Sequence, residues 1–392
     1  MRLAVAGTSL ALVAAGCAAD DDSANDEPTT EGGASGQTAS ARGVTADTIT
    51  IGYTYLDFDS LVEQGLAASG YGDQELAFQT MVDALNEDGG INGRQIEVVY
   101  EPYSPLGTED AEAVCLRLTD EHEVFAVLGG FLGPAEPANS CIVGQQETIL
   151  VGGVQSAERL AEAQAPWITD RATRTRQADI LLGLLDSEGM LEDASVAVVT
   201  NSDAQDAHDS VLEALEDYDV EPVDDLSLDA PIGDIPAEDA AWSALGERVR
   251  SSGADTLLVA GNPGSTIRNN AALGLDVDIW VLDQETLLNL GTSVSADAAR
   301  GVVSAAPPGD LLEQESFADC RDTYTAANPD VTILPQEERE ETDENVLSGL
   351  SLSCSFLDLF EVVATAAGDD LNNETFAAAF DGLDEFSIAT QP

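Results

Sequence analysis

Short apolar runs recur along the chain from about residue 48, and stretches with helical periodicity separate them. Some of these runs, such as VFAVL at residues 124–128, are apolar throughout, which is typical of parallel strands covered by helices on both faces. The alternation predicts an α/β protein built from βαβ units. We expect nine strands, and therefore two sheets, at residues 48–55, 95–101, 124–128, 148–152, 195–200, 220–226, 255–260, 278–283 and 301–305.

Prolines interrupt this alternation at residues 166–169 (PWIT) and again at residues 307–309 (PPG). At each interruption we expect the chain to cross from one lobe to the other. The predicted first lobe comprises residues 47–168 and 308–392, and the predicted second lobe comprises residues 169–307. Ligands of open α/β sheets lie beyond the carboxyl ends of the strands, and lobes joined in this way can hinge. The cleft between the lobes is therefore the predicted site.

The first residues form an export signal followed by a tether. Residues 1–16 contain a positively charged N-terminus, a short apolar run and small residues directly before Cys17. Small residues before a cysteine resemble the bacterial lipobox, in which the cysteine receives a lipid. Residues 17–46 are polar and acidic, so we expect a disordered tether. These features predict a protein held by a lipid on Cys17 at the outer face of the cell membrane. Past residue 16 we find no apolar run that approaches the 18 residues needed to span a bilayer.

The charge balance excludes several functions. The chain has 392 residues with 14 basic and 74 acidic side chains, a formal net charge of −60. Nucleic acids and anionic lipid surfaces need a cationic face, which this composition does not provide. All basic residues are arginines, so the chain has no lysine for Schiff-base or P-loop chemistry.

Four cysteines follow Cys17, and an even number in an exported chain favours two disulfides. Three connectivities are possible. We prefer Cys115 with Cys141 and Cys320 with Cys354, because each pair lies on neighbouring predicted helices. There is no Cys-x-x-Cys, so we expect neither a metal nor any other cofactor.

Several segments match a known family: ITIGYTY at 49–55, ALNEDGGINGRQIEVVYE at 84–101, VFAVLGG at 124–130 and ILVGG at 149–153. The chain resembles the leucine/isoleucine/valine-binding group of type I extracytoplasmic solute-binding proteins, from about residue 48 to 386. The resemblance implies two Rossmann-like lobes with parallel sheets of flavodoxin-like strand order, a hinge and a ligand cleft. Residues 89–94 (GGINGR) are the most recognisable motif, and we interpret them as a structural turn. The family usually returns a final segment to the second lobe, whereas this sequence stops at Pro392, so we expect that third crossing to be missing.

In the first lobe, the resemblance implies that hydroxyls and backbone N–H groups at helix starts hold a ligand carboxylate. Ser156 stands at such a helix start, and its alternative role is to cap that helix without touching ligand. Gln155 shares the turn. Phe131, in a glycine-rich loop, either packs on an apolar part of the ligand or fills the lobe interface. Tyr53 and Tyr55 suggest an aromatic wall, although strand alternation makes one of them ordinary core.

In the second lobe, the family uses a carboxylate to bind the ligand ammonium, and Glu285 matches that position best. Gln205 and Asn262 stand where amino-acid-binding relatives carry aromatic residues, which argues against a simple branched-chain amino acid. Arg174 and Arg176, with Arg171, gather at the predicted crossover. They either neutralise nearby carboxylates or clamp an anionic group of the ligand.

The leading hypothesis is a lipid-anchored, monomeric substrate-binding protein of an ABC importer. Its partners would be a small polar solute and the permease subunits in the membrane. The chain contains no Gly-x-Gly-x-x-Gly after its first strand, no Walker A motif, no Gly-x-Ser-x-Gly and no His-Glu-x-x-His, so we do not expect an enzyme. The alternative is an extracytoplasmic sensing module that acts through a separate membrane receptor.

Overall fold

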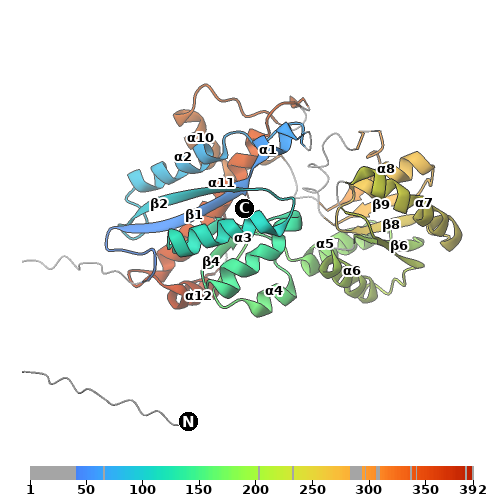
Figure 1. The fold of residues 1–392 in the computed structure, drawn as a ribbon, viewed down its shortest axis with the longest axis horizontal. Coiled ribbons are helices and arrows are strands. Elements are labelled where there is room, and N and C mark those ends of the chain that lie inside the picture. The colour runs from blue at the N-terminus through green and yellow to red at the C-terminus, as the bar shows by residue number, and fades with distance from the viewer. Residues whose placement is uncertain are drawn as a thin grey trace, which may run out of the picture. The chain divides into compact units, whose positions relative to one another are not determined.

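A computed structural model describes residues 41–390, apart from 65–66, 202–203, 232–233, 283–293, 296, 306–309, 336–337, 341 and 385. The strands form two five-stranded sheets, and all strand pairs are parallel, as the apolar runs predict (Figure 1). The first sheet has the order β2-β1-β3-β4-β5, with β1 Thr48–Leu56, β2 Gln95–Tyr103, β3 Ala126–Gly129, β4 Ile149–Gly152 and β5 Trp167–Ile168. The second has the order β10-β9-β8-β6-β7, with β6 Val196–Asn201, β7 Asp224–Leu228, β8 Thr256–Ala260, β9 Asp278–Val281 and β10 Val302–Ser304.

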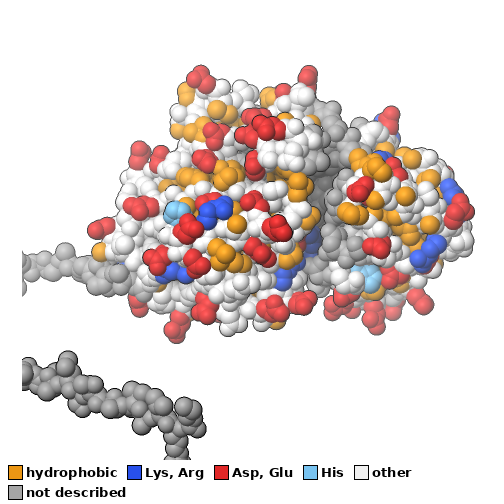
Figure 2. Space-filling view, viewed as in Figure 1, with side chains coloured by type: hydrophobic (Ala, Val, Ile, Leu, Met, Phe, Trp, Pro, Cys, Tyr) orange, Lys and Arg blue, Asp and Glu red, His pale blue; other side chains and the backbone are white. Residues whose placement is uncertain are grey.

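Each sheet is covered by helices, and we call each sheet with its helices a lobe. The helices of the first lobe are α1 Phe58–Glu63, α2 Gln74–Glu87, α3 Thr108–Leu116, α4 Ala157–Glu162, α10 Glu315–Ala327, α11 Val346–Ala367 and α12 Asn373–Gly382. Short helical turns in this lobe are η1 Arg117–Glu121, η2 Gly133–Ala138, η3 Cys141–Gln145 and η5 Leu311–Glu313. The second lobe carries α5 Arg174–Ser187, α6 Gln205–Asp217, α7 Ile235–Ser252 and α8 Gly264–Leu273. Acidic side chains are spread over the visible face of both lobes (Figure 2).

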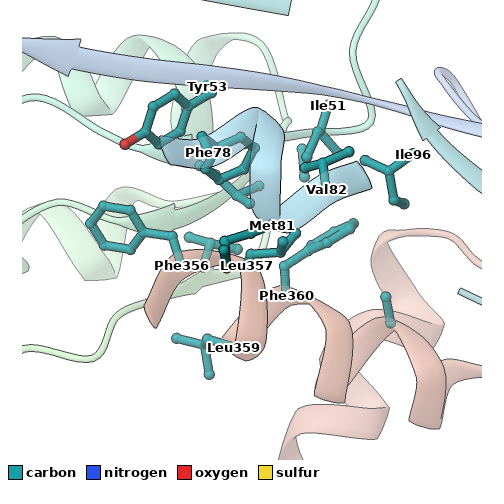
Figure 3. Close-up of a cluster of buried hydrophobic side chains, with 14 of the residues drawn as sticks. Ile51, Tyr53, Phe78, Met81, Val82, Ile96, Phe356, Leu357, Leu359 and Phe360 are labelled. Carbon is teal, nitrogen blue, oxygen red and sulfur yellow. The ribbon is translucent and has the colours of Figure 1, made fainter. Parts of the chain in front are cut away.

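The core of the first lobe lies between the sheet and helices from both ends of the chain. Side chains of α2 pack against side chains of α11 beneath β1, where Phe78 and Phe360 are both fully buried (Figure 3). α11 meets the length and hydropathy criteria for a membrane span, with 56% of its apolar window buried. Our expectation of no such run past residue 16 was therefore wrong. The apolar side chains of α11 pack into the core of the first lobe.

Two predicted boundaries differ from the structure. The segment expected to be a crossover turn contains β5, because the Trp167 and Ile168 backbones pair with β4 and the Trp167 indole N–H donates to the Gly152 carbonyl at 2.8 Å. The strand predicted at 220–226 begins only at Asp224. Pro222 has no N–H to donate to a sheet, so pairing with β6 starts after it.

Residues 89–94 form a tight turn between α2 and β2, as expected. The backbones of Ile91 and Arg94 exchange two hydrogen bonds of 2.9 and 3.0 Å. Gly90 has φ +67°, and a Cβ there would lie 1.9 Å from the Arg94 carbonyl oxygen, so only glycine fits. Asn92 donates to the Ala364 and Thr365 carbonyls at the end of α11 at 3.3 and 3.2 Å. The motif therefore has a structural role, because it connects α2 to β2 and bonds this turn to the end of α11.

The two disulfides are the predicted pairs, Cys115–Cys141 and Cys320–Cys354. The first joins α3 to η3, and the second joins α10 to α11. After β10, the described helices α10, α11 and α12 all pack into the core of the first lobe. The part of the chain that the structure describes contains no later strand in the second sheet.

Candidate functional site

The strand order predicts one ligand site in each lobe. In the first sheet β1 lies between β2 and β3, so the connections on its two sides leave in opposite directions, and a ligand site is expected at the carboxyl ends of β1 and β3. In the second sheet β6 lies between β7 and β8, so the corresponding site is expected at the carboxyl ends of β6 and β8. These strand ends form the candidate site.

Glycines bring the strand ends of the first lobe close together. Gly129 ends β3 with φ +107°, and a Cβ there would lie 2.2 Å from the Thr54 carbonyl oxygen. Gly152 ends β4 with φ +116°, and a Cβ there would lie 2.6 Å from the Gly129 carbonyl oxygen. Neither position can carry a side chain without moving the backbone, so this edge of the sheet presents main-chain groups.

The polar side chains expected at this edge are engaged within the lobe. Ser156 caps α4, and its Oγ accepts from the Arg159 backbone N at 3.2 Å and from Arg159 Nε at 3.1 Å. Gln155 Nε2 donates to the Trp167 carbonyl at 2.6 Å. Ser156 therefore caps α4, which is one of the two roles that the sequence predicts for it.

Tyr53 and Tyr55 lie on the same face of β1, because residues two apart in a strand point the same way, and their rings stack at 5.7 Å. Strand alternation therefore does not separate the two tyrosines, contrary to our expectation, and they differ only in burial. Tyr53 is fully buried, stacks on Phe78 at 4.0 Å, and has a pKa raised to about 12 by that burial (Figure 3). Tyr55 is half-buried and donates to Glu75, and burial and that carboxylate raise its pKa. Tyr53 is thus fully part of the core, whereas Tyr55 is partly buried and packs against that core.

Phe131 points into the interior of the first lobe. Its ring is fully buried and meets the Tyr103 ring edge-on at 5.0 Å. The backbone of Phe131 exchanges hydrogen bonds of 2.8 and 2.9 Å with the Asn139 side chain. The residue therefore stabilises the turn after β3 from within the first lobe, and its packing on an apolar part of a ligand stays a prediction.

Arginines and one carboxylate meet where the chain passes between the lobes. Glu136 of η2 pairs with Arg159 at 3.2 Å and with Arg174 at 3.6 Å. Arg174 also donates to Gln177 at 3.1 Å, whereas the side chain of Arg176 is exposed. Glu136 was not predicted, although its place just after the glycine-rich loop that follows β3 was a usable signal.

The second lobe holds its predicted polar residues at the start of two helices. Gln205 begins α6, and its Nε2 lies 2.8 Å from His208 Nδ1 and 2.9 Å from an Asp209 oxygen. Asn262 follows β8, and its Oδ1 accepts from the Gly264 backbone N at 2.8 Å at the start of α8. Both lie next to the carboxyl ends of β6 and β8. Glu285 and Cys17 lie outside the described residues.

The described residues contain no group of three or more His, Cys, Asp or Glu side chains placed to hold a metal ion. What the arrangement offers is main-chain groups, arginine-rich polar contacts and a half-buried tyrosine. The described residues form two parallel α/β lobes, each with a reversal of strand order, which is an architecture suited to binding a ligand.

The family model of the periplasmic binding proteins matches residues 48–391, and the chain belongs to this family. The members of this family and the similar solved structures are solute-binding proteins that act outside the cytoplasm, and they are not enzymes. No curated protein matches the sequence.

Solved structures share the fold at low sequence identity. The branched-chain amino acid transporter substrate-binding protein LivJ of Streptococcus pneumoniae, in complex with isoleucine, is 20% identical with a TM-score of 0.58, over 88% of this chain and 91% of that one. A solute-binding protein of Rhodopseudomonas palustris BisB5 with 3,4-dihydroxybenzoic acid is 16% identical with a TM-score of 0.60, over 88% of both chains. A fatty acid ABC transporter substrate-binding protein of Thermomonospora curvata is 17% identical with a TM-score of 0.59, over 88% of this chain and 83% of that one.

Proposed function

We propose that this chain is the lipid-anchored substrate-binding component of an ABC importer. It takes a small polar solute, either an amino acid, an amide or a related carboxylate, into the cleft between its two lobes. The observation that carries the proposal is the reversal of strand order in each of two lobes, within a chain of the periplasmic binding protein family. Neighbouring structures hold isoleucine or a dihydroxybenzoic acid, which are solutes of this size.

The proposed contacts come from both lobes. We expect the backbone at Gly129 and Gly152, where close approaches exclude side chains, to line the cleft on the side of the first lobe. The side chains that we propose to contact solute are Tyr55, Gln155, Ser156, Arg174, Arg176, Gln205, Asn262 and Glu285. Because Ser156, Gln155 and Asn262 already have internal partners, we expect them to contribute through exchange of those hydrogen bonds when the lobes close.

The solute class is tested by thermal unfolding of the mature chain against amino acids, amides, urea, and aliphatic and aromatic carboxylates. A solute present at about 100 times its dissociation constant should add roughly 2.7 kcal/mol of stability. We expect one chemical class to raise the melting temperature. A panel without any shift would contradict the proposed function.

The anchor and the partner are tested in the cell membrane. A lipid on Cys17 should carry the protein into the detergent phase on phase partitioning, and Cys17→Ala should move it to the aqueous phase. Recovery of ABC permease subunits with the cross-linked wild-type chain would support an importer. Recovery of a receptor or kinase without permease subunits would instead support the sensing module.

A further inference from the structure

Arg339 is a partly buried arginine in a very acidic chain. It lies in the loop between α10 and α11, and its Nη1 is completely buried with no hydrogen-bond acceptor among the described residues. No described carboxylate forms an ion pair with it, although the chain has 74 acidic side chains. Arg300, in contrast, is 80% exposed and still has an Asp297 oxygen 3.0 Å away. The described part of the protein therefore leaves the Arg339 cation unpaired.

Burial lowers the pKa of Arg339, and the electrostatic effects of Tyr71 and Asp343 only partly oppose this change. A guanidinium stays charged in proteins, so Arg339 carries a positive charge that has lost part of its hydration. A charge in such surroundings costs free energy unless it is paired and hydrogen-bonded. A carboxylate of a ligand meets both requirements, because it accepts two parallel hydrogen bonds from a guanidinium.

The course of α11 shows where the loop before it lies relative to the first sheet. Phe356, near the middle of α11, lies beside the carboxyl end of β4, since a Cβ on Gly152 would be 2.9 Å from its ring. Carbonyls near the end of α11 accept from Asn92, in the turn before the amino end of β2. α11 therefore runs from the carboxyl-end edge of the sheet towards its amino-end edge. The loop before α11 lies beyond the carboxyl ends of the strands.

Backbone contacts fasten the same loop beside the segment between β1 and α2. The Asn345 N–H, directly before α11, donates to the Gly70 carbonyl at 2.8 Å. A Cβ on Gly349 would lie 2.2 Å from the Tyr71 carbonyl oxygen, so the first turn of α11 also touches this segment. The segment follows the carboxyl end of β1, where the strand order predicts a ligand site. The unpaired arginine thus belongs to a loop at the edge where the solute is expected.

We propose that Arg339 is a specificity-determining residue of the cleft and binds a carboxylate of the solute. The inference rests on the proposed solute-binding function and narrows its solute class to molecules that carry an acid group. A carboxylate neutralises the guanidinium through paired hydrogen bonds. An amide of the same shape leaves the partly buried charge uncompensated. Arg339 therefore distinguishes an acid from its amide.

The test compares acid and amide pairs of equal shape with the mature full chain. Titration calorimetry measures leucine against leucinamide, isovalerate against isovaleramide, and 4-hydroxybenzoate against 4-hydroxybenzamide. Any other acid that raises the melting temperature in the wider panel is compared with its own amide. We expect an acid to bind, and its amide to bind at least about tenfold more weakly.

Arg339→Gln removes the charge and the paired donors. It should weaken binding of the acid about 10- to 100-fold and leave binding of its amide nearly unchanged. The melting temperature without solute should stay the same or rise, because the variant loses no described partner and removes a poorly hydrated charge. Arg300→Gln, which removes the same charge from an 80% exposed side chain, should leave the affinities unchanged. If Arg339→Gln does not fold, Arg339→Lys takes its place, since it keeps the charge without the paired geometry and should also weaken the acid.

The outcomes separate the role of Arg339 from the proposed function. The role of Arg339 is wrong, and the solute-binding function stands, if an acid and its amide bind equally or if only neutral solutes bind. The same conclusion follows if the folded variant at Arg339 binds the acid as tightly as the wild type does. A lower melting temperature with unchanged affinity would show that Arg339 is structural. If neither these compounds nor any solute of the wider panel binds the wild-type chain, the proposed function itself fails.

Discussion

Arg94 shows how one residue stabilises the first lobe without serving the cleft. Its side chain is fully buried, and its guanidinium donates to the Thr45 and Asp369 carbonyls, each at 2.8 Å. Asp369 follows the end of α11, where a positive charge interacts favourably with the helix dipole. Arg94 thus ties the segment before β1, the turn after α2 and the end of α11 into one unit.

Arg94→Met should lower the free energy of unfolding by about 2 to 4 kcal/mol, because the Thr45 and Asp369 carbonyls lose the charged donor of a buried side chain. Urea denaturation measures the change. Arg300→Met is the control, since Arg300 is 80% exposed, and its effect should stay within about 0.5 kcal/mol. A loss below about 1 kcal/mol for Arg94→Met would show that these bonds contribute little.

His208 gives the second lobe a pH-dependent contact. Its ring nitrogens lie 3.0 Å from Asp209 and 2.9 Å from Asp225, which joins α6 to β7. Burial opposes the charged ring, but hydrogen bonds to the two carboxylates outweigh it, and the pKa of His208 is raised. A raised pKa means that the folded state binds the proton more tightly than the unfolded state.

This contribution is complete below the unfolded pKa of about 6.5 and is lost as the pH rises through the higher folded pKa. His208→Gln should therefore destabilise the protein more at pH 6 than at pH 9. Chemical denaturation of both proteins at the two pH values gives the difference. An equal penalty at both values would mean that the ring contributes only as a neutral hydrogen-bonding group.

At the scale of elements, α10 and α11 come after the last described strand yet complete the core of the first lobe. Cys320 and Cys354 fasten these two helices to each other across 34 residues of chain. The cross-link lies within the helical layer, and the proposed solute contacts come from other elements. It should therefore affect stability without affecting affinity.

Replacing Cys320 and Cys354 together by alanine should lower stability by about 3 to 4 kcal/mol, from the entropy of closing a loop of this length. Thermal unfolding measures the loss, and solute affinity at 25 °C serves as the internal control. Adding a reductant to the double variant should lower stability further, because Cys115–Cys141 remains. A double variant as stable as the wild type would contradict a structural role for this bond.

At the scale of the whole molecule, acidity dominates both lobes. The formal net charge is −60, and acidic side chains are spread over the visible surface (Figure 2). Like charges at this density repel one another and oppose the compact state. The repulsion is screened by salt, because the Debye length falls from about 10 Å at 0.1 M to about 3 Å at 1 M.

The melting temperature should therefore rise with NaCl from 0.05 to 1 M, with most of the gain at the low end of this range. Choline chloride at equal ionic strength is the control, since screening does not depend on the cation. A gain with sodium alone would indicate specific cation binding in place of screening. A melting temperature that falls with salt would show that attractive ion pairs outweigh the repulsion.

Much of the fold could be predicted because its signals are local. The apolar run of β3 predicts a buried parallel strand without further context, and residues 89–94 predict a turn because Gly90 and Asn92 can adopt positive φ. The candidate site could be predicted only as far as the strand ends. Ser156 was placed correctly at a helix start, but its hydrogen bonds with Arg159 could not be read from the sequence.

The sequence by itself determined the α/β class, the parallel strands and the acidity, because each follows from composition or from residues close in the chain. It favoured the observed disulfide pairs among three possible connectivities, and the structure decided between them. Only the tertiary structure decided that Tyr53 enters the core while Tyr55 stays at the edge, and that Glu136 meets Arg159 and Arg174. These outcomes depend on strand register and on contacts between distant segments. Local sequence patterns do not encode these contacts, because the contacts form only when distant segments of the chain pack together.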